Sequence, residues 1–472
     1  MGSHRGAFLR FGYSRHVLHP SVVRVVVSRR TYDYDAPWTV EAESPSYGTG
    51  VIIAPGRVLT TANLAANAVA LHVQHAGAGD RAAARVISID HDRDLALLEL
   101  FSRGELFAGV APAEIGSLPA VGDELDMVAA ASLDAGPSLL RGTVAKLDSV
   151  RYVHSQRHLP ALTVDVGIGN HHEAGPGFVD GKLVGLANQK PTDAENVCDL
   201  VPTPLIVAFL QGAKRGLVSA VPSLGISVQN LEHPHLRAHL GQDAGVVVTN
   251  VAHGESADGV LRRGDVLVGV GGRPLTRTGK LELLDAWLRY DAVLALHHPG
   301  DRLRVDFVRD RQRLGADLTL TPWQPLVPRA RYDQPPHYVV YAGLLFQSLT
   351  RDYLTTWDEW WNKGPKEFLQ LYYSGRRTPA QHEVVILTNI LADEATRGYE
   401  HLYNEAVSAI DGHLPRDLSD FAGRLARARG TVQIDTTSGG VIVLDVEEAQ
   451  RATARVLDTY AIPADRTAGL PS

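Results

Sequence analysis

The stretch NHHEAGPGF, residues 170–178, places three side chains that can do chemistry next to one another: His171, His172 and Glu173. Imidazole and carboxylate groups transfer protons and bind metal ions. The Gly-Pro pair leads into FVDGKLVGLAN, whose two short apolar runs around an Asp-Gly turn predict a β-hairpin. No serine lies within the stretch, so it offers acid, base and metal-ligand types but no hydroxyl nucleophile.

A metal-dependent hydrolase would use these groups as ligands together with Asp94. Adjacent histidines in an extended loop tend to point to opposite sides, so only one of them joins Glu173 easily. The sequence contains no HExxH motif or comparable spacing. We therefore expect no metal site and no other cofactor. The one cysteine, Cys198, lies in NVCDLVPTP, which predicts a buried strand where a thiol is inert.

Composition narrows the class of protein. The 472 residues predict about three domains, and 44% hydrophobic residues indicate a globular chain. A net charge of −7 argues against a nucleic-acid partner, and one cysteine fits a reducing compartment. The longest apolar runs are too short to cross a membrane, and residues 1–20 lack a continuous apolar segment. We expect a soluble, cytoplasmic protein with a short flexible N-terminal arm.

Three parts follow one another along the chain. Residues 21 to 214 are a series of short strand patterns, and a helix is predicted over 202–216 from its leading proline and closing glycine. Residues 215 to 325 alternate as strands around a Gly-Asp turn, and we expect the segment 280–301 to be helical. A connector with five prolines spans 322–336. The remaining segment echoes the middle part loosely, which suggests an internal duplication.

Several of these segments resemble the Deg/HtrA family, trypsin-like proteases fused to PDZ domains, and most closely its plant-type branch with two PDZ domains. The segments are GTGVIIAPGRVLTTANLAANA, HDRDLALLEL, VDVGIGNHHEAGPGFVDGKLVGLAN, SLGISVQ, GVLRRGDVLVGVGGRPL and HYVVYAGLLFQSLT. The resemblance implies a mainly β fold, a chymotrypsin-like double β-barrel followed by two PDZ-like α+β domains. The implied boundaries are 1–20 for the arm, 21–214 for the protease-like domain, 215–325 for the first PDZ domain and 326–468 for the second.

The resemblance also assigns catalytic positions, and most of them have changed type. Asp94 matches the aspartate, whereas Asn63 occupies the histidine position and Glu173 the serine position. His171 matches the glycine of the oxyanion hole. A carboxamide cannot act as the base, and a carboxylate is a better leaving group than the amine that it would have to expel. The resemblance therefore implies a protease fold without proteolysis. Glu173 is either a solvated acid or a cap for the remaining N–H donors.

The peptide-binding features implied by the resemblance are better preserved. In PDZ domains, backbone N–H groups of a turn bind a C-terminal carboxylate and the peptide adds a strand to the sheet edge. The candidate turn is SLGI, formed by Ser223, Leu224, Gly225 and Ile226. Side chains of the following helix would line the pocket, namely Tyr290, Val293 and Leu294. The alternative is a groove that the chain itself blocks.

The last part of the chain is rich in aromatic residues: Trp357, Trp360, Trp361, Tyr372 and Tyr373. We expect some of them to form an interface, because aromatic side chains dominate association energetics. The leading hypothesis is an oligomeric Deg-like scaffold that binds peptide or protein C-termini through its PDZ domains and associates through the second one. The alternatives are an active serine-type endopeptidase with a non-standard site and a metal-dependent endopeptidase.

Overall fold

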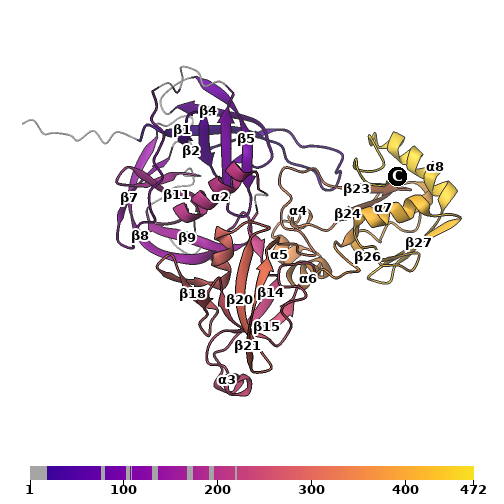
Figure 1. Ribbon diagram of the computed structural model, residues 1–472. Helices are drawn as coiled ribbons and strands as arrows, with labels where there is room; N and C mark the ends of the chain where they lie inside the picture. Colours follow the sequence, from indigo (N-terminus) through magenta and orange to yellow (C-terminus); the bar gives the residue numbers. More distant parts are fainter. Residues whose placement is uncertain are drawn as a thin grey trace, which may run out of the picture.

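The computed structural model describes residues 19–75, 80–101, 107, 109–129, 137–166, 174–190, 196–217 and 220–471. Figure 1 shows two barrels at the start of the chain, a middle unit below them and a C-terminal unit set to one side. We call residues 220–322 the middle unit, 323–336 the connector and 337–471 the C-terminal unit. The fold is mainly β, as the sequence predicted.

The first barrel closes because β1 pairs with both β2 and β4. Its strands in spatial order are β1 (Val22–Arg29), β2 (Ser44–Ala54), β3 (Arg57–Thr60), β6 (Leu95–Leu100), β5 (Arg81–Asp90) and β4 (Ala68–His75). Every second residue of β1, namely Val23, Val25 and Val27, packs into the barrel core. Val22, Arg24 and Val26, which point to the opposite face, are buried as well, so both faces of this strand are covered. The short helix α1 (Ala62–Ala65) follows β3.

The second barrel closes in the same way, with β7 paired to both β8 and β10. Its strands in spatial order are β10 (Pro176–Val179), β11 (Lys182–Gln189), β12 (Val197–Pro202), β9 (His158–Asp165), β8 (Ser138–Arg151) and β7 (Glu124–Ala129). Helix α2 (Thr203–Arg215) begins with a proline in its first turn and ends at Gly216 in the left-handed region, which confirms the predicted helix.

The middle unit is a sheet with a short helix at one end. The sheet runs β14 (Ile226–Asn230), β15 (Val246–Val251), β16 (Val266–Val270), β20 (Arg302–Arg309) and β21 (Gln312–Thr319), with β17 (Arg273–Pro274) beside β16. Strands β13 (Pro222–Ser223) and β22 (Thr321–Pro322) pair with each other where the unit begins and ends, and α3 (Pro234–Leu240) follows β14. Strand β14 lies at the edge of the sheet.

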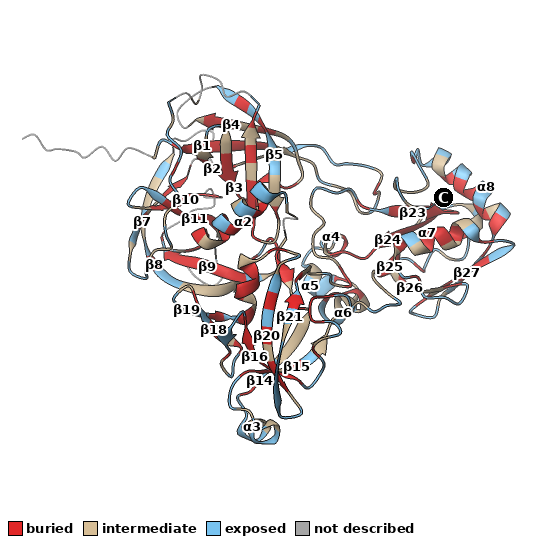
Figure 2. Cartoon of the chain, in the orientation of Figure 1, coloured by how far each residue is buried: buried red, intermediate tan, exposed pale blue. Residues whose placement is uncertain are grey.

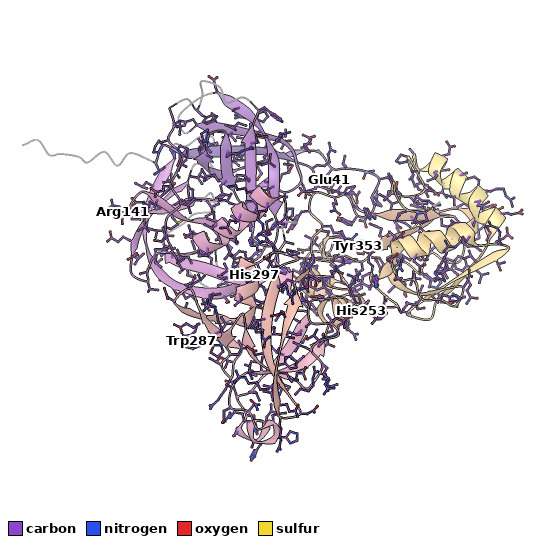
Figure 3. The ribbon with its side chains drawn as sticks, in the orientation of Figure 1. Glu41, Arg141, His253, Trp287, His297 and Tyr353 are labelled. Atoms are coloured by element: carbon purple, nitrogen blue, oxygen red, sulfur yellow. The ribbon has the colours of Figure 1, made fainter. Side chains whose placement is uncertain are left out.

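The helix predicted over 280–301 is wrong. The segment forms the hairpin β18 (Lys280–Leu283) and β19 (Ala286–Arg289), followed by the 3₁₀ helix η2 (Tyr290–Leu296). Leu281 and Leu283 are buried while Glu282 between them is exposed, which is the two-residue period of a strand. Leu284 and Asp285 turn the chain with φ of 55° and 58°. Trp287 projects outward from this hairpin (Figure 3).

The C-terminal unit is a sheet covered by helices on both faces. The sheet runs β23 (Tyr338–Tyr341), β24 (Leu344–Ser348), β25 (Val385–Ile390), β26 (Glu405–Ile410), β27 (Thr431–Thr436) and β28 (Val441–Asp445). Val385 and Leu387 share a core with α7 (Leu418–Arg427) and α8 (Val446–Thr459). Ile386 belongs to the core on the other face, with α4 (Arg351–Leu354) and α6 (Lys366–Ser374). Short α5 (Trp360–Lys363) and η3 (Glu394–Thr396) complete the unit.

The aromatic segment divides between core and surface. Tyr372 is buried, and Trp357 and Trp360 pack partly against the same core. Trp361 and Tyr373 are 61% and 59% exposed, and the ring of each contacts that of Trp360. Of the five aromatic residues, these two are exposed enough to fit the predicted interface, which stays a prediction.

The barrels and the middle unit share one hydrophobic core. Phe209 of α2 and Leu294 of η2 belong to the same cluster, which also reaches Tyr152 and Leu159 of the second barrel. Figure 2 shows buried residues in β9 and, below it, in β20. Because apolar burial is the main stabilising term, the middle unit is fixed against the barrels rather than tethered to them.

Candidate functional site

Asn63 and Asp94 lie together at the edge of the first barrel. Thr61 caps helix α1, and within that turn the backbone N–H of Asn63 donates to Asp94 Oδ1 at 2.6 Å. Arg29 Nη2 donates to the carbonyl oxygens of Asn63 and Leu64 at 2.5 and 3.0 Å. Asp94 is 1% exposed, so its carboxylate is held in place from the protein side. The side chain of Asn63 can donate and accept hydrogen bonds but has no basic nitrogen.

The other three groups of the predicted site, His171, His172 and Glu173, lie outside the described residues. The chain is described again from Ala174, which is buried in the core of the first barrel. The predicted hairpin follows: β10 pairs with β11 around Asp180 and Gly181, both with positive φ. The hairpin prediction is confirmed, whereas the roles assigned to Glu173 and His171 stay predictions.

The loop that carries Asp94 also joins the barrels to the middle unit. Arg93 is fully buried, and its guanidinium donates to Ala295 O at 2.9 Å and His297 O at 2.6 Å. Its charge is balanced by Asp90 at 2.5 Å. Figure 3 shows His297 where the barrels meet the middle unit. Sequence reasoning found Asp94 in HDRDLALLEL but missed Arg93. The only available signal was an arginine directly before a buried strand.

The same loop binds the connector through a pair of histidines, half-buried His91 and buried His154. His91 Nε2 lies 2.8 Å from Asp333 Oδ2, and His91 Nδ1 lies 3.0 Å from His154 Nε2. The Tyr332 ring stacks on His154 at 4.0 Å. Burial, with a smaller contribution from the nearby His91 and Arg351, lowers the pKa of His154 to about 2. His154 is therefore a neutral partner at ordinary pH.

The candidate peptide-binding turn has the backbone that such a turn needs. Gly225 has a φ of 72°, and a Cβ there would lie 2.3 Å from Glu255 Cβ, so only glycine fits. Its N–H donates to Ser223 Oγ at 2.9 Å, and Ala252 N–H donates to its carbonyl oxygen at 2.6 Å. Leu224 is buried beneath the turn, and Ile226 opens edge strand β14.

The pocket residues predicted beside this turn are packed differently. Tyr290, Val293 and Leu294 are 7%, 5% and 2% exposed and belong to the core that joins the middle unit to the barrels. They lie in η2 rather than in a regular α-helix. Their role in lining a peptide groove stays a prediction, and in this structure they serve the packing between units.

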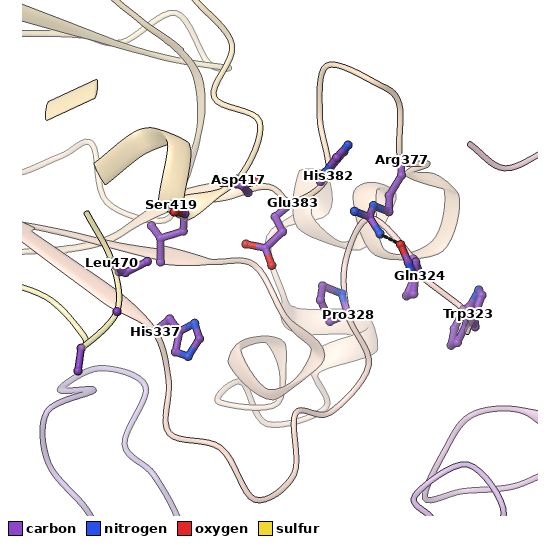
Figure 4. Close-up of a pocket in the computed structure, with 14 residues that line it drawn as sticks. Trp323, Gln324, Pro328, His337, Arg377, His382, Glu383, Asp417, Ser419 and Leu470 are labelled. Atoms are coloured by element: carbon purple, nitrogen blue, oxygen red, sulfur yellow. Dashed lines mark hydrogen bonds between the residues drawn. The ribbon is translucent and has the colours of Figure 1, made fainter. Parts of the chain in front are cut away.

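Two cavities share lining residues at the start of the connector. The larger has a volume of about 630 Å³ and separates the connector from the start of α7 and the C-terminal tail (Figure 4). The smaller, about 180 Å³, opens directly on the turn at Gly225. Trp323, Gln324 and Arg377 line both, and Figure 4 shows the Arg377 guanidinium hydrogen-bonded to Gln324 between them.

Comparisons with known proteins agree with this arrangement. The model of the trypsin-like peptidase domain matches residues 48–186, and PDZ domain models match 219–296 and 327–469. Protease Do-like 2, chloroplastic, from Arabidopsis thaliana is 27% identical over 458 residues, which cover 95% of this chain and 75% of the relative. Protease Do-like 4, mitochondrial, from the same plant is 25% identical and covers 94% and 84%.

Among solved structures, the HtrA-type protease AlgW with a tripeptide matches 64% of this chain and 94% of its own, with a TM-score of 0.50 and 19% identity. Together with the domain matches, the full-length relatives decide the family. The chain belongs to the Deg/HtrA family.

A Deg/HtrA chain with these three domains contains two units of the PDZ type, which confirms the predicted duplication. They differ at the sheet edge. In the C-terminal unit the tail lies along β23: Val340 N–H donates to Asp465 O at 2.6 Å and Thr467 N–H to Tyr338 O at 3.1 Å. The chain's own C-terminal tail therefore occupies this edge.

The described part of this Deg/HtrA chain also contains the thiol that the sequence singled out. Cys198 is fully buried in β12 (Val197–Pro202), as predicted, and burial raises the pKa of its thiol to about 12. Among the described residues, which do not include His171, His172 and Glu173, no three His, Cys, Asp or Glu side chains gather into a possible metal site. No helix within the described ranges has both the length and the apolar character to cross a membrane.

Proposed function

We propose that this Deg/HtrA-family chain does not cleave peptide bonds at its protease-like site and acts instead as an oligomeric scaffold that binds polypeptide C-termini. The loss of cleavage is supported by the residue at the position expected for the general base, which is Asn63. Its backbone N–H donates to Asp94 Oδ1 at 2.6 Å, and the residue in that place carries a carboxamide. A general base must take the proton of the nucleophile, and an amide nitrogen does not.

The second missing group is a nucleophile. The resemblance aligns Glu173 with the attacking serine, and a carboxylate attacking an amide would be expelled in preference to the amine. In subtilisin, loss of the serine or the histidine alone lowers kcat by about 10⁶-fold, and the losses do not add. Asn63 and Glu173 together therefore predict no physiological proteolysis at this site.

Peptide binding is supported by the turn at Gly225 and by the free edge position of β14 in the middle unit. A PDZ turn binds a carboxylate through backbone N–H groups, so changes in the protease-like site leave this capacity untouched. Self-association is supported by Trp361 and Tyr373, which are exposed together on the C-terminal unit. Large exposed aromatic side chains are typical of interfaces.

The test uses the full chain at neutral pH with casein and with a library of unfolded peptides. We expect no new peptide termini by mass spectrometry and no labelling by a fluorophosphonate probe. A fluorescent peptide with a free C-terminus should bind, and its C-terminal amide should bind at least tenfold more weakly. Cleavage with probe labelling would favour the serine-type alternative. Cleavage that a chelator abolishes would favour the metal-dependent one.

A further inference from the structure

The smaller cavity beside the Gly225 turn is lined by two different units. The middle unit contributes the turn and Glu255, and the connector and the C-terminal unit contribute three arginines, Arg329, Arg376 and Arg377. Glu255 is the one acid among the lining residues. It is 5% exposed, and burial raises the pKa of its carboxyl, which favours the neutral form. The cavity therefore carries a positive charge at the place where a PDZ turn receives its ligand.

Arg376 is held over one face of the edge strand. Its Nη1 donates to Ser227 Oγ at 3.1 Å. With the Asn250 amide turned to satisfy both of its polar atoms, the same nitrogen donates to the Asn250 side-chain oxygen at 2.5 Å. Ser227 and Asn250 are cross-strand partners of β14 and β15, so their side chains share a face. Arg376 thus lies above the strand that a bound peptide would extend.

The loop that carries these arginines has little freedom. Gly375 ends α6, and a Cβ there would lie 2.3 Å from Leu371 O and 2.9 Å from Leu326 of the connector. Arg377 donates to the Gln324 side chain, and the Gln324 backbone N–H donates in turn to Glu255. The side chains that accept hydrogen bonds from Arg376 and Arg377, namely Ser227, Asn250 and Gln324, are uncharged. Within the described residues, neither Arg376 nor Arg377 forms an ion pair with a carboxylate.

The geometry of an added strand determines which side chain of the bound peptide lies near Arg376. A peptide whose carboxylate is bound at the turn places its last residue opposite Ile226 and its penultimate residue opposite Ser227. Ile226 packs toward the hydrophobic core, so the last side chain points to the apolar face. Successive side chains alternate, so the penultimate one lies on the face of Ser227, Asn250 and Arg376.

We propose that Arg376 and Arg377 of the C-terminal unit make the middle unit selective for peptides with an acidic penultimate residue before an apolar, free C-terminus. This inference rests on the proposed peptide binding and adds a specificity that the middle unit alone does not supply. The two PDZ units would then form one composite site. The C-terminal unit recognises the charge of the peptide's penultimate side chain, and the middle unit binds the peptide backbone.

The experiment measures fluorescence anisotropy of the full chain with labelled peptides Gly-Ser-Gly-Ala-Thr-X-Z. The last residue Z is Val, Leu or Phe, and X is Glu, Gln or Lys. We expect the Glu peptides to bind about three- to tenfold more tightly than the Gln peptides and the Lys peptides to bind most weakly. The double variant Arg376→Gln, Arg377→Gln should lose this order. Arg376→Glu should reverse it in favour of Lys.

Arg263→Gln, at an exposed arginine of the middle unit, is the matched control and should keep the wild-type order. Equal affinities for Glu, Gln and Lys, with amidation still weakening binding, would overturn the charge selectivity and leave the proposed function standing. No binding of any peptide would overturn both. The wild-type order of affinities is decisive by itself, even if an arginine variant fails to fold.

Discussion

The described part of the protease-like site, Asn63 with Asp94, and the turn at Gly225 are both fixed by backbone hydrogen bonds, but they differ in what their chemistry requires. At the first, the Asn63 N–H still binds the Asp94 carboxylate at 2.6 Å, although the side chain beside it has lost its basicity. At the second, the ligand-binding groups are the backbone itself, shaped by one glycine. A site made from backbone tolerates changes of side chain, whereas a site made from three side chains does not.

Restoring the catalytic side chains of the protease-like site tests this difference and should give the largest effect. The double variant Asn63→His, Glu173→Ser supplies the triad residues but should cleave casein only feebly while His171 remains. Adding His171→Gly should increase the rate by about 10²-fold or more, because an oxyanion-hole donor contributes roughly 3–4 kcal/mol. Initial rates of casein cleavage and fluorophosphonate labelling measure both steps.

The control for the rebuilt site is the triple variant with Asp94→Asn added, which should return to the background rate. Equal rates for the double and triple variants would show that position 171 does not limit the oxyanion hole.

At the turn of Gly225, by contrast, the large effect should come from a change of the backbone rather than of a side chain. Gly225→Ala forces a Cβ into Glu255 at a φ of 72°, which should cost about 1–3 kcal/mol and abolish measurable peptide binding. The matched variant in the C-terminal unit is Gly343→Ala, where φ is 93° and a Cβ would lie 2.7 Å from Leu391 O. It should cost similar stability but leave peptide binding within about twofold. Thermal unfolding and anisotropy separate the two effects.

If Gly343→Ala weakens peptide binding as much as Gly225→Ala does, the C-terminal unit holds the ligand and the contrast between the two PDZ units is misplaced. Ser223→Ala, which removes only a hydroxyl from the same turn, should change affinity by less than about fivefold.

The sequence predicted features that local chemistry determines. The helix over 202–216 has its proline and glycine signals, and the hairpin after Gly175 has its Asp-Gly turn. The hairpin at 280–289 was missed because its turn places Leu284 at positive φ, a conformation that leucine rarely adopts. Its alternating leucines were still visible as a two-residue period.

Contacts between distant segments carry no such local signal. Arg93 binds a carbonyl 202 residues away, and Arg376 binds Ser227 across 149 residues. Each residue alone is an ordinary arginine in a loop or near a helix end. Burial of Arg93 and the nearness of Arg376 to the sheet edge arise only when the units pack, so pattern analysis of one chain could not find them.

Self-association tests whether the C-terminal unit has a role beyond the binding turn. A chain ending at Pro328 should be a monomer at micromolar concentration by light scattering, whereas the full chain should be larger. The double variant Trp361→Ala, Tyr373→Ala should weaken association by roughly tenfold or more, because interface aromatic residues often contribute about 2 kcal/mol each. Trp287→Ala, at an exposed tryptophan of the middle unit, is the control. Monomers in every case would place these aromatic residues outside any interface.

The smallest predicted effect concerns His154, which links the loop of Asp94 to the connector between the two PDZ units. Its pKa is lowered to about 2, mainly by burial, from an ordinary value near 6.5. Below pH 6.5 the unfolded chain therefore binds a proton at His154, whereas His154 of the folded chain stays unprotonated. Stability from this group is complete above pH 6.5 and falls as the pH is lowered, by at most about 1.4 kcal/mol per pH unit.

The variant His154→Gln keeps a hydrogen-bonding side chain toward His91 but cannot titrate. We expect its urea midpoint to decline less steeply than wild type between pH 6 and pH 4, by the equivalent of about one proton. His235→Gln, at an exposed histidine of α3, should leave the slope unchanged. His91 and Asp333 lie in the same cluster and are present in both the wild type and His154→Gln, so the difference between these two proteins reports His154. Parallel pH profiles for wild type and His154→Gln would mean that the buried histidine is protonated in the folded chain. The connector would then be held by charge rather than by the stacking of Tyr332 on a neutral ring.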